Sequence, residues 1–357
     1  MRYLIILLTT SLLFWTPGCA DKPVDPGDSR PVARGPQKPY PPLDPALHAA
    51  ADRVLSEMTR SSDPILRVHA LEGIQDSNGT SHKEEILQAL NDKEARVRFA
   101  AALAAGQLQI HEAQWPLLAI AEDPSENVRV AVRFALHKLG YKELSHDLEK
   151  MAADPSALVR GNTAFVLGLL GEKSAAKILR VLLDDPEAPV REQAAEALWR
   201  LQLDDEAGLK ELIGLTLSSH PDDEMIGYLA LAQPRNTRVR QHIRPGLRGI
   251  AANNPDLDKD LEKIYDKYGS KWALTVPLVA ARAMGMLGSD EGVVIAVHGA
   301  YSPDPQLRML AALAFGAIGR PDTQQVLKML LDDKDASVRI AAATAILQLK
   351  PPGELPF

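Results

Sequence analysis

The sequence predicts an all-α protein, an α-solenoid of stacked helix pairs that repeats every 31 residues. Composition supports this, because 46% of the residues are hydrophobic but only 5% are aromatic, so the core must be aliphatic and rich in alanine. A fixed period of this length is typical of stacked repeats, in which each unit contacts only its neighbours. The period is carried by arginines in steps of 31 residues: Arg67, Arg98, Arg129, Arg160 and Arg191, and later Arg308 and Arg339.

The chain begins with a predicted signal peptide, residues 1–18. Arg2 precedes a mostly apolar run, Tyr3 to Trp15, that is too short to span a bilayer as a helix. The residues Thr16-Pro17-Gly18-Cys19 resemble the bacterial lipobox, in which the cysteine becomes lipidated. Thr16 and Pro17 differ from the residues that are usual at those two positions of the lipobox. We therefore expect an exported protein anchored in a membrane through Cys19. The alternative is an ordinary signal peptide with an incidental cysteine.

Residues 19–45 are predicted to be a tether. Eight prolines lie between positions 22 and 45, and the segment has too few large apolar residues to bury a core. Cys19 is the sole cysteine of the chain, so it can form neither an internal disulfide nor a thiolate zinc cage.

Repeats in one register are predicted over residues 46–221 and again over 272–350, with 351–357 as a tail. In the unit 154–185, Asp154 and Pro155 form a helix start, and apolar residues then recur at helical spacing. Gly171 ends this first helix, and a second apolar stripe runs from Ala175 to Leu182. Because curved stacks present a concave face, we expect that face to be lined by the second helices.

The pattern Asp-Pro-x-x-x-Val-Arg, followed by an alanine-rich helix that ends in Leu-Gly, resembles the HEAT repeat, specifically the short bacterial type of the phycobilisome lyases. The resemblance covers about 50–350. It implies a ladder of hydrogen bonds between aspartates and arginines of stacked repeats. The residues that match those positions are Asp123, Asp154, Asp185, Asp333, Arg129, Arg160, Arg191 and Arg339.

The register breaks between the two blocks of repeats. Pro277 stands 31 residues before Arg308, yet it lies 86 residues after Arg191, which is 24 more than two repeat lengths. We therefore predict a degenerate repeat with an inserted helix over 222–271. A run without acidic residues in this unit holds five arginines: Arg235, Arg238, Arg240, Arg244 and Arg248. We interpret them as a candidate docking patch for an acidic protein partner or a phosphate-bearing surface, and the alternative is a solvated helix face.

Three enzymatic alternatives have weaker support. His220-Pro221-Asp222-Asp223-Glu224 resembles the zinc motif of N-acetylglucosamine deacetylases, in which His220 and Asp223 would bind zinc and Asp222 would act as base. That family also needs a His-x-x-His motif, which this sequence lacks. His111-Glu112 resembles one His-Glu pair of deoxyhypusine hydroxylase, which requires four. Bilin lyase activity follows only from the family resemblance, and those lyases act in the cytoplasm.

These observations are most consistent with a membrane-tethered scaffold that binds another macromolecule in cell-envelope assembly or regulation. They do not favour an enzyme. The 40 basic and 47 acidic side chains give a net charge of −7, which argues against nucleic acid held by phosphate contacts. We expect a protein partner and a lipid anchor, with no cofactor and no small-molecule substrate.

Overall fold

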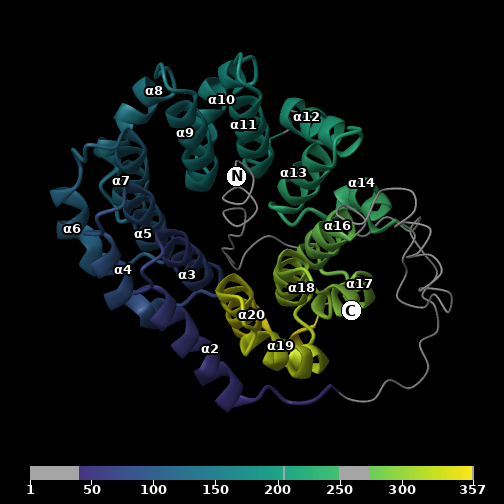
Figure 1. Ribbon diagram of the computed structural model, residues 1–357. Coiled ribbons are helices and arrows are strands. Elements are labelled where there is room, and N and C mark those ends of the chain that lie inside the picture. The colour runs from purple at the N-terminus through teal and green to yellow at the C-terminus, as the bar shows by residue number, and fades with distance from the viewer. Residues whose placement is uncertain (1–39, 204–205, 249–273, 356–357) are drawn as a thin grey trace.

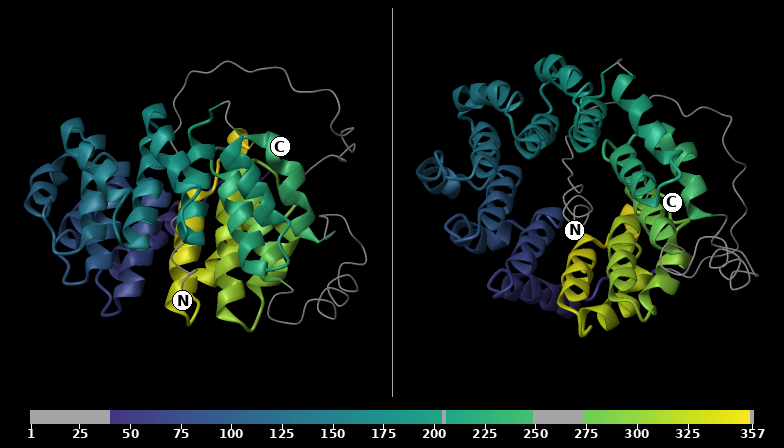
Figure 2. Two further views of the ribbon diagram at one scale, coloured as in Figure 1. Left: turned by 90° about the horizontal axis from the view of Figure 1, so that it is seen from above. Right: turned by 45° about the horizontal axis from the view of Figure 1, so that its top comes forward.

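The computed structural model describes residues 40–203, 206–248 and 274–355, and within these ranges every regular element is a helix. The all-α prediction is therefore confirmed. The helices are arranged as a ring of pairs (Figure 1), and the rotated views in Figure 2 show the same closed arrangement. Among the described residues, no helix is both long enough and apolar enough to cross a bilayer.

One helix of each pair forms the inner wall of the ring. Inner helices that begin at Ala95, Ala157 and Ala188 keep the 31-residue step. The helix that begins at Pro221 starts two residues later than this step predicts. Neighbouring inner helices pack against each other all the way round the ring. They are α3 (Pro64–Asp76), α5 (Ala95–Gln107), α7 (Glu126–Lys138), α9 (Ala157–Leu170), α11 (Ala188–Arg200), α13 (Pro221–Ala232), α16 (Thr275–Met286), α18 (Pro305–Ile318) and α20 (Ala336–Gln348).

The other helices cover the outside and are mostly shorter. They are α2 (Pro45–Met58), α4 (Lys83–Ala89), α6 (Gln114–Ala119), α8 (Asp147–Met151), α10 (Ala176–Leu182), α12 (Ala207–Thr216), α14 (Arg240–Ile243), α17 (Val293–Ala300) and α19 (Gln324–Leu331). Short 3₁₀ turns lie in the connections: η1 (Thr80–His82), η2 (His111–Ala113), η3 (Lys142–His146), η4 (Lys173–Ala175), η5 (Thr237–Val239), η6 (Arg244–Leu247), η7 (Pro321–Thr323) and η8 (Pro352–Glu354). Our expectation that second helices line the concave face is therefore wrong, because the arginine-bearing first helices do so.

Inner helices end at a residue in the left-handed backbone conformation. Gly140 and Gly171 have positive φ angles, as do Gly288 and Gly319, which is the helix stop inferred from the sequence. The equivalent positions in other repeats carry side chains and keep the positive φ: Asn78, Gln109, Gln202 and Arg235. The stop is thus imposed by the fold, and glycine only makes it less costly.

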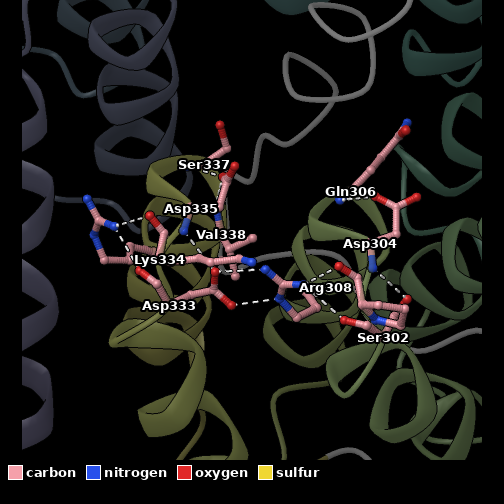
Figure 3. A network of polar contacts seen from close by, with 11 residues as sticks. Ser302, Asp304, Gln306, Arg308, Asp333, Lys334, Asp335, Ser337 and Val338 are labelled. Atoms are coloured by element: carbon pink, nitrogen blue, oxygen red, sulfur yellow. Dashed lines mark hydrogen bonds and ion pairs between the residues drawn. The ribbon is translucent and has the colours of Figure 1, made fainter.

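Arginines of the inner helices bind the carboxylate of the following repeat. Arg160 donates from Nε and Nη2 to the two oxygens of Asp185 at 2.7 and 2.9 Å, and from Nη1 to the carbonyl oxygen of Asp154 at 2.8 Å. The hydrogen bond from Arg160 is the main reason that the pKa of Asp185 lies below its ordinary value. The same two-bond contact joins Arg67 to Asp92 and Arg98 to Asp123, and in each pair the residues are 25 positions apart. Figure 3 shows the pair of Arg308 and Asp333.

The other expected members of the ladder make different contacts. Arg129 donates to Glu126 of its own helix and to the carbonyl oxygen of Asp123, while Asp154 accepts the backbone N–H of Ser156. Arg191 and Arg339 donate to the carbonyl oxygens six residues earlier, those of Asp185 and Asp333. Every repeat arginine thus holds the turn before its helix, but only some also hold the next repeat.

The last repeat closes the ring by packing on the first. Helix α20 contacts both α2 and α3, as Figures 1 and 2 show. Gln348 donates to the carbonyl oxygen of Asp76 at 3.1 Å. The side chain of Gln324 accepts the backbone N–H of Asp44 and donates to the carbonyl oxygen of Pro42. At the closest approach, a Cβ on Gly73 would collide with Oγ1 of Thr344.

We expect Arg160→Ala to lower the free energy of unfolding by about 3 kcal/mol, because the buried Asp185 carboxylate would lose its compensating cation. The two side chains are only 13% and 6% exposed, so water replaces the guanidinium poorly. Urea denaturation followed by circular dichroism measures the loss. Arg129→Ala is the matched control, because its partner Glu126 is 47% exposed, and it should cost about 1 kcal/mol or less. Equal losses would contradict the role of the inter-repeat pair.

We also expect Gly73→Val to destabilise the closed ring by about 1–3 kcal/mol, because the added methyl groups must displace Thr344 and Leu55. Small-angle scattering should show a larger radius of gyration if the seam between α3 and α20 opens. Gly214→Ala is the control, since nothing lies near its missing Cβ, and it should raise stability by about 0.5–1 kcal/mol. An unchanged radius and stability for Gly73→Val would show that this contact is dispensable.

Candidate functional site

The inner wall of the ring holds an apolar cavity of about 570 Å³, which we call the inner cavity. It lies over α3, α5, α7 and α9. Its larger apolar side chains are those of Ile65, Val68, Phe99, Leu103, Leu158 and Phe165. Leu158 is 63% exposed. A mostly apolar cavity with a few polar groups is the usual form of a binding site.

Two asparagines supply a hydrogen-bonding edge to the inner cavity. Asn162 of α9 donates from Nδ2 to Oδ1 of Asn127 in α7 at 2.6 Å. This bond orients both amides and leaves one donor group, Nδ2 of Asn127, and one acceptor, Oδ1 of Asn162. A peptide group offers the complementary acceptor and donor. The edge can therefore bind an extended polypeptide backbone.

Two titratable residues of α3 lie at the base of the cavity. His69 and Glu72 are 4% and 7% exposed, and Nε2 of His69 and Oε2 of Glu72 have no hydrogen-bond partner among the described residues. Burial is the largest cause that raises the pKa of Glu72 well above its ordinary value, followed by the charge of Asp76, while Arg282 acts in the opposite direction. Burial also lowers the pKa of His69. Both shifts favour the uncharged forms, which suits an apolar ligand.

Sequence reasoning missed the inner cavity. A signal was present, because the chain has only six phenylalanines and two of them, Phe99 and Phe165, line this one site. The period alone could not show that α5 and α9 turn these rings toward the centre.

Three arginines of the five-arginine cluster, Arg235, Arg238 and Arg244, are exposed, and members of the cluster also contact other groups of the chain. Arg240 donates to the carbonyl oxygen of Leu287 at the end of α16, and Arg244 pairs with Glu291 at 2.9 Å. Arg248 pairs with Glu224 of α13 at 2.6 Å. These contacts join the irregular repeat to its neighbours.

The other two arginines also contact protein groups. The guanidinium of Arg238 lies 4.9 Å from the centre of the Trp199 ring, a cation–π arrangement. Arg235 lines a second cavity of about 240 Å³ together with Arg282 and Lys350. The carboxyl ends of α3, α13, α16, α18 and α20 converge on this second cavity, and helix dipoles favour cations at such ends. The positive charge there has a structural explanation.

The His220 motif starts a helix. His220 is the N-cap residue of α13, and Asp222 and Asp223 lie in its first turn, where acidic side chains favour the helix dipole. Asp223 accepts a hydrogen bond from Ser218 at 2.7 Å. Across the described ranges, no group of three or more histidine, cysteine, aspartate or glutamate side chains is placed to hold a metal ion. The alternative of a zinc site at this motif has no geometric support within that part of the chain.

Three predictions lie wholly or largely outside the described residues. These are the signal segment with Cys19, the tether over 19–45, which is described only from residue 40, and the helix expected within the insertion, part of which falls in 249–273.

The HEAT-repeat family model matches residues 51–137, 114–199, 145–232 and 273–355, which together cover well over half of the chain. The ring of helix pairs is thus built from HEAT repeats, and the chain belongs to the HEAT-repeat family. No curated protein matches the sequence.

Three solved structures with similar helix pairs are each distant from this chain in sequence. The complex of CpcE and CpcF of phycocyanin lyase from Nostoc sp. is 20% identical with a TM-score of 0.40, over 74% of this chain and 98% of that one. YibA of Escherichia coli is 18% identical with a TM-score of 0.33, over 79% and 97%. Human deoxyhypusine hydroxylase in complex with glycerol is 18% identical with a TM-score of 0.33, over 85% and 96%.

Proposed function

We propose that this chain is an exported, lipid-anchored HEAT-repeat scaffold that binds a protein partner through the inner cavity, in cell-envelope assembly or regulation. The observation that carries the proposal is the inner cavity itself: a mostly apolar surface on the concave wall of a ring, with asparagines and the charged residues Glu94 and Arg96 among its lining. The proposed partner contributes an extended segment with large apolar side chains.

The chemistry of the cavity supports a polypeptide as the ligand. Its apolar walls bury side chains, and the Asn127–Asn162 pair offers hydrogen bonds to a backbone. An acidic partner would bind at the arginine cluster, where Arg240, Arg244 and Arg248 already contact groups within the chain. We therefore base the proposal on apolar and amide contacts instead. No observation on the described residues favours a hydrolase or a lyase.

The exposed leucine of the cavity provides a test. Leu158→Gln should weaken binding of the partner recovered from membranes roughly tenfold or more, because a leucine buried on binding contributes about 1.5–3 kcal/mol. Titration calorimetry with the purified partner measures the affinity. Val181→Gln is the matched control, since Val181 is 69% exposed but lies on the outer helix α10, and it should leave the affinity unchanged. Equal affinities for the parent and Leu158→Gln would place the binding site elsewhere.

A photo-crosslinking amino acid at each of these two positions provides an independent measurement in intact membranes. Position 158 should form one reproducible protein adduct, and position 181 should not form it. An adduct formed equally at both positions would contradict binding inside the ring.

The lipid anchor is proposed from the sequence, in which Gly18-Cys19 follows an apolar segment. Cys19→Ser should shift the protein from the membrane fraction to the soluble fraction or leave the signal segment uncleaved, because serine has no thiol to accept a lipid. Fractionation and the electrophoretic mobility of the mature chain measure the change. If the variant fractionates and migrates like the parent, the protein is not anchored through this residue.

A further inference from the structure

Two cations in the second cavity have no anionic partner. Arg235 follows the end of α13 and Lys350 follows the end of α20, and both line this cavity of about 240 Å³. Neither side chain forms a hydrogen bond or an ion pair with any described residue. The nearby helix ends favour positive charge, yet neither cation donates to a carbonyl oxygen of those ends. Both side chains therefore keep their donors for a group that enters the cavity.

The charges that line the second cavity are unbalanced. Of its four charged lining residues in the described part of the chain, only Asp76 is acidic, and its charge acts on the buried Arg282. Burial is the largest cause that lowers the pKa of Lys350, followed by the charge of Arg235, while Glu354 acts in the opposite direction. The two cations thus repel each other, and an anion between them would relieve that repulsion.

The two side chains suit an oxyanion such as phosphate. Arg235 is exposed and Lys350 is half-buried, so the cavity opens to solvent on the side of these cations. A guanidinium pairs with two oxygens of one phosphate, and an ammonium adds a further donor. A water molecule occupies about 30 Å³ in the liquid, so the cavity has room for a phosphate group.

The tether joins the ring beside this cavity. Tyr40 is the first described residue, and the centre of its ring lies 5.5 Å from the guanidinium carbon of Arg320. Arg320 directly follows Gly319, whose carbonyl oxygen accepts the backbone N–H of Lys350 at 3.0 Å. The chain that leads from Cys19 therefore meets the ring on the same rim as the cavity, the rim at which the inner helices end.

We propose that the second cavity binds the phosphate of an anionic phospholipid through Arg235 and Lys350, and so turns the rim at which the inner helices end toward the membrane. This inference rests on the lipid anchor of the proposed function, which would hold the cavity close to the headgroups. Tethering raises the effective concentration of the phosphate, so a weak individual contact is enough to set the orientation. The inner cavity, whose residues lie toward the starts of α3, α5 and α9, would then face the partner and not the lipid.

The test measures how the mature chain, residues 19–357 with Cys19→Ser, partitions onto phospholipid vesicles in a co-sedimentation assay. This substitution removes the lipid, so only the protein's own side chains hold it to the vesicle. Vesicles with equal parts of phosphatidylglycerol and phosphatidylcholine should bind the protein about tenfold more tightly than phosphatidylcholine alone, because each basic residue at an anionic surface strengthens binding roughly fivefold. The preference should decline as salt rises past about 0.15 M, where the Debye length is about 8 Å.

Replacing both cations assigns the preference to the cavity. Arg235→Gln with Lys350→Gln should abolish the preference for anionic vesicles. It should not lower the melting temperature, because neither side chain has a partner to lose. Glutamine suits position 235, since Gln109 and Gln202 have the same positive φ at the ends of other inner helices.

Lys93→Gln with Lys334→Gln is the matched control. It removes the same charge from two exposed lysines in turns on the opposite rim, where inner helices start, and it should keep the parent's preference. Equal binding of the parent to both kinds of vesicle would overturn the proposal. So would a preference that survives the loss of Arg235 and Lys350, or one that the control loses equally.

Inorganic phosphate distinguishes lipid from a soluble source. At constant ionic strength, millimolar phosphate should displace the parent from anionic vesicles. Saturable phosphate binding in titration calorimetry, without any preference for anionic vesicles, would identify a site for free phosphate and overturn the assignment to lipid. The anchor is decided separately, because the vesicle assay uses a chain without lipid, whereas fractionation of Cys19→Ser in cells tests the anchor alone.

Discussion

The bidentate pair between an arginine and the aspartate 25 residues later is the interaction on which the architecture depends. The guanidinium holds two carbonyl oxygens of its own turn through Nη1 and the next repeat's carboxylate through Nε and Nη2, as in Arg160. That carboxylate in turn accepts the N–H of Glu187 at the start of the next inner helix. One side chain thus fixes a turn, a helix start and the step between repeats. Its planar fork explains why lysine would not serve equally well.

The stacking of helix pairs follows from the residues of each repeat, and so it could be predicted. Arginine, turn aspartate and stop glycine recur at fixed spacing because each performs a local task within one unit or between adjacent units. Gln109 and Gln202 show the limit of this reasoning, since they adopt the conformation of Gly140 and Gly171 without a visible signal. Tertiary packing of the next helix, and not local preference, determines those helix ends.

Features that depend on distant residues could not be predicted. Arg244 meets Glu291, and Arg240 meets the end of α16, after an insertion whose path the sequence pattern does not define. Assignment of inner and outer helices depends on the direction of curvature, which arises from small rotations at every interface. The inner cavity could not be predicted for the same two reasons. Its residues come from four helices, and Leu158 and Phe165 resemble ordinary core positions until the direction of curvature is known.

The contact between α3 and α20 sets a constraint on how this chain can fold and change. A flexible chain would lose roughly 5 kcal/mol of entropy in bringing together residues as far apart as Gly73 and Thr344, so curvature already present in the partial stack must align the ends. An open solenoid can gain or lose a unit with little consequence for the rest. Here a deleted unit would leave the two ends facing a gap, and an added one would make them collide. The number of repeats is therefore part of the fold, and the first inner helix completes its packing only after the last has been synthesised.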